Sequence, residues 1–168
     1  MHKQRIVIVL DCDQTMWDHP DATLLQQPFN LISNNVITDS QNEKVRLSYG
    51  LMDFLMWAKE QGFILAIASW NEPRNVLRLF ELFKIRELLD IIIVEPHPNK
   101  DKMFEKIVSM LQINSEAKII FIDDNPYMHE IVRKRFPKVI SIIYGQDARD
   151  FYEVKKIVRN IIRNSESP

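Results

Sequence analysis

The stretch Arg5-Ile-Val-Ile-Val-Leu-Asp11-Cys-Asp13-Gln-Thr15-Met-Trp17 joins an apolar run to a polar turn that carries two carboxylates. Residues 5–10 predict a strand, because the run is short and rich in β-branched side chains. The run is almost continuously apolar, which favours a strand that is covered on both faces in a parallel sheet. The same character recurs at residues 63–68, 90–94, 118–122 and 139–143.

Stretches with helical periodicity lie between and after these runs. Leu51, Phe54, Leu55 and Ala58 share one helical face, and the same spacing begins again at residues 76, 104 and 151. Alternating strands and helices predict an α/β fold, a single doubly wound, Rossmann-like domain with a five-stranded parallel sheet. Counting only the long strands, we expect the order 5-4-1-2-3, which sets strands one and four side by side.

Residues 18–48 interrupt the alternation. This segment is polar, contains Pro20 and Pro28, and has a turn sequence at residues 33–35. Residues 29–32 and 36–38 predict a small β-hairpin around that turn, so we interpret the segment as a flap. It is too short and polar for a cap domain, and the gap from 69 to 100 already holds a helix and a strand. We therefore expect one domain over residues 1–168, with no cap.

The composition restricts the class of protein. The chain has 168 residues, is 46% hydrophobic and carries a formal net charge of −1, so no basic field indicates a nucleic-acid or membrane partner. A single cysteine, Cys12, excludes an internal disulfide framework. The apolar runs are too short to span a bilayer, and residues 1–5 are too short and polar for a signal peptide. We expect a cytoplasmic protein; its oligomeric state stays open.

Polar groups gather where the predicted strands end, which is where ligands bind in doubly wound sheets. They are Asp11 and Asp13 after the first strand, Ser69-Trp70-Asn71 after the second, Lys100 and Lys102 after the third, and Asp123-Asp124 after the fourth.

Phosphoryl transfer is the chemistry that uses this set. A carboxylate such as Asp11 can attack phosphorus and hold the group covalently. Because nucleophile and phosphate repel, a hard cation must lie between them, and Asp11, the backbone carbonyl of Asp13 and Asp123 offer the oxygen ligands that Mg²⁺ prefers. The Ser69 hydroxyl, nearby backbone N–H groups and a lysine can bind the phosphate oxygens. Asp13 is placed to move the proton in each step.

Each feature alone has a structural explanation. Asp-x-Asp-x-Thr can form an Asx-turn, and Ser69 or Asn71 can cap a helix. Trp17 either packs locally or walls the substrate site. Cys12 is predicted to point into the core, away from the two carboxylates. Capping explains the four motifs poorly once they occur together, each after its own strand.

The order of motifs resembles the haloacid dehalogenase superfamily and, within it, the magnesium-dependent phosphatase type 1 family, a capless subclass. The resemblance rests on Asp-x-Asp-x-Thr-x-Trp at 11–17, Pro28-Phe29, Ala68-Ser69 and Phe121-x-Asp123-Asp124. The pair Trp70-Asn71 departs from the residues common in relatives, so substrate choice can differ.

The resemblance implies a role for each matched residue. Asp11 is the expected nucleophile and Asp13 the acid/base, while Asp123 joins Asp11 on Mg²⁺. Matching Phe104 to the family assigns the phosphate-binding lysine to Lys100, with Lys102 second. Whether Asp124 touches the metal or only water stays open. Apart from the resemblance, an open site without a cap takes its specificity from residues at the rim, so we expect Trp17, Trp70 and Asn71 to contact the substrate.

We therefore expect a Mg²⁺-dependent phosphomonoesterase that acts on accessible aryl or sugar phosphates, or on phosphotyrosine, with no nucleic-acid or membrane partner. A phosphotransferase or phosphomutase of the same superfamily is an alternative. The alternative from another class is a receiver-type phospho-acceptor module, in which the acidic pair follows the first strand instead of the fourth.

Overall fold

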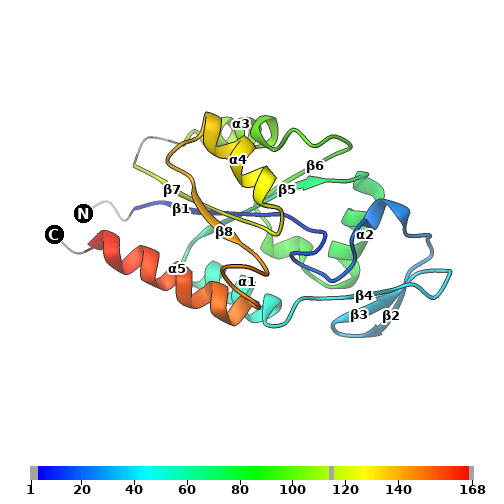
Figure 1. Cartoon of the computed structure of the whole chain (residues 1–168). Helices are drawn as coiled ribbons and strands as arrows, with labels where there is room; N and C mark the ends of the chain where they lie inside the picture. Colours follow the sequence, from blue (N-terminus) through cyan, green and yellow to red (C-terminus); the bar gives the residue numbers. More distant parts are fainter. Residues whose placement is uncertain (1–3, 114–115, 167–168) are drawn as a thin grey trace.

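A computed structural model describes residues 4–113 and 116–166 of the chain. Five parallel strands form the central sheet (Figure 1). They are β1 (Ile6–Leu10), β5 (Ile64–Trp70), β6 (Ile91–Glu95), β7 (Lys118–Asp123) and β8 (Ile140–Ile143), in the order β6-β5-β1-β7-β8. Counted as five long strands, this order reads 3-2-1-4-5, which is the predicted order seen from the opposite edge. The labels differ because the flap strands are numbered as well.

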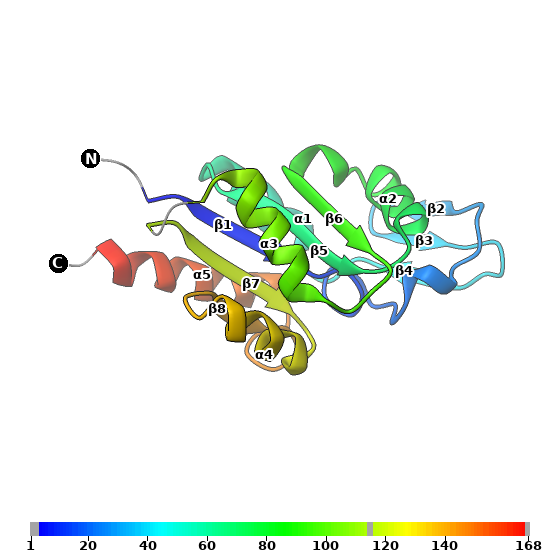
Figure 2. The same cartoon turned by 90° about the horizontal axis from the view of Figure 1, so that it is seen from above.

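Helices cover both faces of the sheet, as Figures 1 and 2 show. α3 (Lys100–Leu111) and α4 (Pro126–Arg135) lie on one face, and α1 (Leu51–Glu60), α2 (Pro73–Leu82) and α5 (Phe151–Glu166) lie on the other. Successive side chains of β1 point to opposite faces, so Ile6, Ile8 and Leu10 join one core cluster while Val7 and Val9 join the second. The continuous apolar run of β1 follows from this two-sided burial.

The helices form where the apolar spacing predicts them. In α2 the buried residues Val76, Leu79 and Phe80 lie on one face, and Pro73 occupies the first turn, where its missing N–H costs nothing. The short 3₁₀ helices η1 (Ala22–Leu24) and η2 (Arg86–Leu88) complete the helical elements of the described residues. None of the helices in these ranges combines the length and the apolar character needed to cross a membrane.

The flap contains one strand more than predicted. The expected hairpin is β2 (Asn30–Ser33) and β3 (Val36–Thr38), and β4 (Lys44–Arg46) pairs antiparallel with β3 to make a three-stranded sheet. β4 was not predicted because its short polar sequence buries a single side chain, Val45. In Figure 1 this small sheet lies beside α2, away from α3 and α4.

Three predicted strands were too short at their carboxyl ends. The backbone ladder continues through Ser69 and Trp70 in β5, through Glu95 in β6 and through Asp123 in β7, since pairing uses backbone groups and tolerates polar side chains. Ser69 and Trp70 therefore belong to the strand instead of following it. This extension holds their side chains at fixed positions on the sheet edge.

Candidate active site

The carboxyl ends of β1 and β7 bring two aspartates side by side. The backbone N–H of Asp11 donates to the Ile122 carbonyl at 3.0 Å, which continues the ladder between the two strands. Asp11 is therefore fixed beside Asp123, the last residue of β7. Both side chains are buried, with 8% and 1% of the residue exposed. Sheet topology thus juxtaposes residues that are more than a hundred positions apart.

Lys100, the first residue of α3, lies between these carboxylates. Its Nζ is 2.6 Å from Asp11 Oδ1 and 3.2 Å from Asp123 Oδ2, and it also donates to the Ala68 carbonyl. Burial lowers the pKa of Lys100, but the charges of Asp11 and Asp123 outweigh burial and raise it above its ordinary value. The ammonium therefore stays charged. Lys102, by contrast, is exposed, so the structure brings only Lys100 to this cluster.

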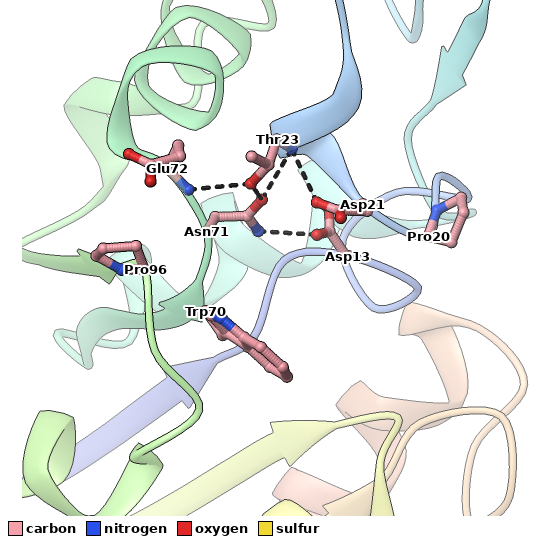
Figure 3. A pocket seen from close by; sticks show the side chains of 8 residues that line it. All are labelled: Asp13, Pro20, Asp21, Thr23, Trp70, Asn71, Glu72 and Pro96. Carbon is pink, nitrogen blue, oxygen red and sulfur yellow. Dashed lines mark hydrogen bonds between the residues drawn. The ribbon is translucent and has the colours of Figure 1, made fainter.

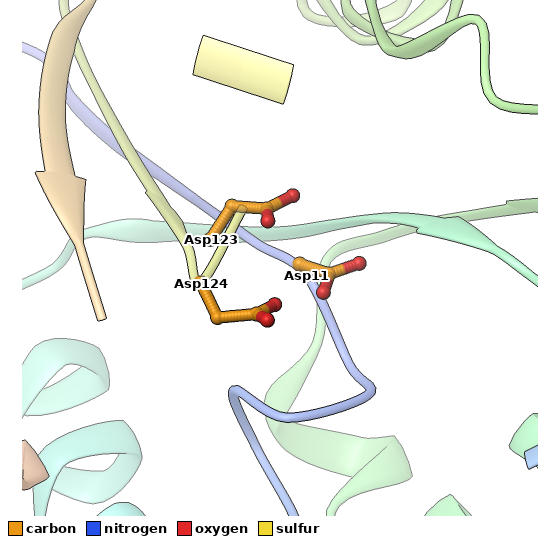
Figure 4. Close-up of side chains that lie close together, drawn as sticks. All are labelled: Asp11, Asp123 and Asp124. Atoms are coloured by element: carbon orange, nitrogen blue, oxygen red, sulfur yellow. The ribbon is translucent and has the colours of Figure 1, made fainter. Parts of the chain in front are cut away.

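Asp11, Asp123 and Asp124 form a cluster of three carboxylates (Figure 4). One oxygen of each lies within 4.8 Å of the others. Thr15 orients Asp124, because its hydroxyl donates to Asp124 Oδ1 at 3.3 Å and accepts from the Asp124 N–H at 3.1 Å. Asp123 Oδ1 accepts from the Asn125 N–H at 2.8 Å. Asp123 Oδ2 is buried and accepts no hydrogen bond from the described residues, although it forms the ion pair with Lys100.

Burial and mutual repulsion make the ionised forms of these carboxylates less favourable. Burial, and then the charge of Asp123, raises the pKa of Asp11 to about 8 despite the lysine. Burial and Asp123 also raise the pKa of Asp124. Three converging carboxylates with one unsatisfied buried oxygen fit a hard divalent cation such as Mg²⁺, which prefers carboxylate ligands. Asp124 belongs to this donor set by its position.

Asp13 lies in different surroundings, among neutral donors, of which Figure 3 shows Asn71. Trp17 Nε1 donates to Asp13 Oδ1 at 2.7 Å, and Asn71 Nδ2 donates to Oδ2 at 2.8 Å. The Ala22 N–H lies 3.2 Å from both oxygens. Burial raises the pKa of Asp13, and the three donors oppose that shift. The carboxyl of Asp13 is therefore held by hydrogen bonds instead of ion pairs.

Trp17 packs locally, which is the first of the two alternatives that the sequence left open. Trp17 is fully buried, packs on Phe80 with ring centroids 5.8 Å apart, and directs its N–H at Asp13. His19 and Phe29, which flank the site in sequence, are buried as well, with 7% exposure each.

Asn71 neither caps a helix nor presents a free amide to a ligand. It is 2% exposed, and the residue at the cap position of α2 is Glu72. Its Nδ2 also donates to the Oγ of Ser69 at 3.0 Å, so the buried Ser69 joins the same network. A contact between Ser69 and phosphate stays a prediction.

Cys12 is buried in the core, as the alternation along the chain predicts. Burial raises the pKa of its thiol well above the ordinary value, which excludes a thiolate nucleophile at neutral pH.

Two adjoining cavities open at this edge. One, of about 170 Å³, is lined by Asp11, Lys100, Asp123 and Asp124 among others. The other cavity has a volume of about 330 Å³. Its polar lining includes Asn71, the half-buried Asp21 and the exposed Glu72, as Figure 3 shows. Asp13, Pro20 and Trp70 line both cavities. Trp70 is 52% exposed, so of the three residues predicted to contact substrate beside Ser69 and Lys100, it alone presents an open surface.

Sequence reasoning missed the groups that hold Asp13 from the flap. No sequence motif marks the backbone N–H of Ala22 or the side chain of Thr23. Ala22 binds Asp13, which is 9 residues away in the sequence, and Thr23 binds Asn71, which is 48 residues away. His129 is a further buried group that the sequence did not single out, and its Nε2 lies 2.9 Å from the Asp123 carbonyl oxygen. Burial lowers the pKa of this imidazole, so it is neutral at neutral pH.

Comparisons with known proteins identify a family and similar folds. A family model described as acid phosphatase matches residues 5–155. The first of the similar solved structures is the phosphatase-domain-containing N-terminal part of a Bacteroides fragilis protein, complexed with Mg. It has a TM-score of 0.64 and 20% identity, and the match covers 95% of this chain but only 40% of that one.

Two further solved structures show the same fold. A haloacid dehalogenase-superfamily hydrolase from Ehrlichia chaffeensis has a TM-score of 0.69 and 14% identity, with 96% of this chain and 100% of that chain covered. CbbY from Rhodobacter sphaeroides, in complex with phosphate, has a TM-score of 0.61 and 16% identity, with 88% and 95% covered. A search of curated proteins found no match.

Proposed function

The chain belongs to the acid phosphatase family, whose model spans most of its length, and we propose that it hydrolyses phosphate monoesters through a phosphoryl group carried on Asp11. The observation that carries the proposal is the buried Lys100 held between Asp11 and Asp123 at 2.6 and 3.2 Å. A cation in this place lowers the pKa of a carboxylate nucleophile below the value that burial alone would give it, and it attracts an anionic substrate.

Asp11, Asp123 and Asp124 are the residues that would hold Mg²⁺, together with the backbone carbonyl of Asp13. The unsatisfied Oδ2 of Asp123 and the raised pKa of Asp11 support this donor set. When bound, Mg²⁺ supplies positive charge that offsets the repulsion between the nucleophile and the phosphate oxygens. The Mg-complexed relative from Bacteroides fragilis is consistent with this choice of ion.

In the first step, an Asp11 oxygen forms a bond to phosphorus while the bond from phosphorus to the ester oxygen breaks. Asp13 gives its proton to the departing oxygen, so an alcohol leaves instead of an alkoxide. Lys100 and Ser69 bind the phosphoryl oxygens during the transfer. In the second step, Asp13, now ionised, takes a proton from water as the water attacks phosphorus, and inorganic phosphate and free Asp11 result.

The range of substrates that the site accepts depends on how much of it the rest of the chain covers. We propose that the chain is a single, capless phosphatase domain whose flap is the cover beside the sheet edge. The cavity of about 330 Å³ next to Asp13 has room for part of a leaving group, and the exposed indole of Trp70 offers a stacking surface. Aryl or sugar phosphates and phosphorylated side chains such as phosphotyrosine fit such an open site.

The position of the acidic pair favours a hydrolase over a receiver-type module. Asp123 and Asp124 follow β7, not β1, and the acid phosphatase match points the same way.

The test is to trap the phosphoryl group. The protein is mixed with p-nitrophenyl phosphate and Mg²⁺, quenched in acid within milliseconds, and analysed by mass spectrometry. We expect steady release of phosphate and a phosphoryl adduct on the peptide that contains Asp11, cleavable by hydroxylamine. Turnover without any adduct in wild type and in a slow Asp13→Asn variant would contradict the covalent route, and a lack of turnover would contradict the proposed function itself.

A further inference from the structure

We propose that Trp17, Asn71 and the flap turn η1 form a positioning frame for Asp13, so that the flap acts as a support for the acid/base group as well as a cover. The inference rests on the proposed function, because it assigns a purpose to residues that hold the proposed proton donor. It differs from the expectation that Trp17 and Asn71 contact the substrate.

The frame restrains both oxygens of the Asp13 carboxyl. Trp17 Nε1 binds Oδ1 and Asn71 Nδ2 binds Oδ2, at 2.7 and 2.8 Å, and the Ala22 N–H lies 3.2 Å from each. A carboxylate offers about four lone-pair sites, so three donors leave little freedom of rotation. Because Asp13 also lines both cavities, the remaining capacity of its oxygens is accessible from the site.

The amide of Asn71 is specified by its surroundings. Its Nδ2 donates to Asp13 and to Ser69 Oγ, while its Oδ1 accepts from the N–H and the hydroxyl of Thr23 at 3.1 and 2.9 Å. All four hydrogen-bonding positions of the amide are used by protein at 2% exposure. A side chain without this donor and acceptor pair leaves buried groups unsatisfied, so Asn71 joins the acid/base residue to the flap through one rigid group.

A second asparagine docks the flap turn onto α2. Asn75 Nδ2 donates to the carbonyls of Ala22 and Leu25, each at 2.8 Å, and Asn75 Oδ1 accepts from Gln27 Nε2 at 3.0 Å. Asn75 is 8% exposed, and these hydrogen bonds connect it to the flap instead of to Asp13. Its bonds hold the Ala22 N–H in place, and that N–H is the third donor to Asp13. Loss of the Asn75 hydrogen bonds therefore moves the Ala22 N–H away from Asp13, although Asn75 itself does not bind Asp13.

The test uses the dependence of the rate on the leaving group. Protonation by Asp13 matters greatly for an alkoxide and little for p-nitrophenolate, which leaves without a proton. In wild type, kcat/KM is measured for p-nitrophenyl phosphate and for glycerol 2-phosphate, since kcat/KM reports the steps up to transfer onto Asp11. The ratio of the two values measures the contribution of the acid, independent of how much enzyme is folded.

Trp17→Phe and Asn71→Ala remove one donor each. For both variants we expect the ratio of kcat/KM for glycerol 2-phosphate to that for p-nitrophenyl phosphate to fall about 10- to 100-fold, part of the 10²- to 10⁴-fold that acid catalysis supplies. Trp17→Phe should leave the value for p-nitrophenyl phosphate within about threefold of wild type, whereas Asn71→Ala also removes the donor to Ser69 Oγ and should lower both values. Asn75→Ala should change the ratio in the same direction by a smaller factor. Trp57→Phe is the matched control, because Trp57 is a buried tryptophan in α1 whose ring packs on Phe54 and Phe63. The ratio for this variant should equal that of wild type.

Equal losses on both substrates would overturn the frame and leave Trp17 and Asn71 with a general structural role. An unchanged ratio in all three variants would overturn it as well. If Trp17→Phe does not fold, Asn71→Ala and Asn75→Ala decide the question by the same ratio. Failure of the proposed function is distinct, because wild type itself would then release no phosphate from either ester.

Discussion

Asp11 and Asp13 are two residues apart on one turn, yet their surroundings are opposite in kind. Asp11 faces charges, namely Lys100, Asp123 and Asp124, and its pKa is raised to about 8 by burial and by the like charge of Asp123. Asp13 faces neutral N–H donors from Trp17 and Asn71. The carboxyl proposed as nucleophile thus has a cation beside it, whereas the carboxyl proposed as acid/base is held by hydrogen bonds without a paired charge.

The substitution Asp11→Asn should have the largest effect, because it tests the role proposed for the residue with charged surroundings. The amide keeps the size of the side chain but cannot attack phosphorus, so kcat should fall about 10⁴-fold or more. Phosphate release under steady-state conditions measures the loss, and circular dichroism checks the fold. Activity at a few per cent of wild type in the purified variant would refute the assignment of the nucleophile.

Lys100→Ala should have the next largest effect. It removes the cation beside Asp11. The loss of one preorganised charge should lower kcat/KM about 10²- to 10³-fold. Lys102→Ala is the matched control, since this exposed lysine lies on the same helix; its change should stay within about twofold. The reverse ranking of the two variants would show that the wrong lysine was assigned.

Addition of Mg²⁺ should raise the thermal stability of the protein through the surroundings of Asp11 and not through those of Asp13. A cation bound by Asp11, Asp123 and Asp124 relieves their repulsion in the folded state alone, so about 100 Kd of Mg²⁺ should raise Tm by roughly 5–10 °C. Chelator should abolish both this increase and turnover. Differential scanning fluorimetry should show the shift in Asp13→Asn but not in Asp123→Asn. A shift of the same size in both variants would place the metal elsewhere.

The smallest expected effect concerns a third aspartate, Asp39 of the flap. Its buried carboxylate accepts from the N–H groups of Gln26, Gln41 and Glu43 at 2.9, 2.8 and 2.8 Å. Burial alone would raise the pKa of Asp39, but these donors outweigh it and lower the pKa below its ordinary value of 3.8. The ionised carboxylate therefore stabilises the flap above that value, and the stabilisation is lost as the pH falls through the lowered pKa.

Asp39→Asn should accordingly lower Tm by about 2–6 °C at neutral pH, as expected for roughly 1–2 kcal/mol of lost hydrogen bonding. The difference from wild type should shrink as the pH is lowered towards and below the depressed pKa. Thermal melts from pH 2 to pH 7 measure this trend. A difference that grows on acidification would contradict the sign of the shift.

Much of the charged cluster around Asp11 was predictable from the sequence, because it depends on the topology of the sheet. A parallel sheet brings the carboxyl ends of its strands to one edge, so residues that follow the first and fourth runs had to meet, and the structure brings Asp11 beside Asp123. Lys100 could be ranked above Lys102 only through the resemblance around Phe104. The geometry agrees with that ranking, because Nζ of Lys100 reaches both carboxylates.

The hydrogen-bonded side was not predictable from spacing. The contact between Trp17 and Asp13 depends on the shape of a turn in which Gln14 has a positive φ of 58°. The contact of Asn71 with Thr23 depends on where the flap docks, and nothing in a polar segment of 31 residues specifies that by periodicity. An exposed aromatic and a buried aromatic look alike in a sequence, so Trp17 and Trp70 were given the same role.

That difference between the tryptophans makes the protein its own optical sensor. The chain has three tryptophans. Trp17 and Trp57 are buried, with 0% and 9% exposure, while Trp70 is 52% exposed at the junction of the two cavities. The solvent-exposed, red-shifted part of the intrinsic fluorescence therefore originates at the rim of the site. A ligand that stacks on Trp70 should shift or quench this component and leave the blue component unchanged, so occupancy can be followed without labelling either molecule.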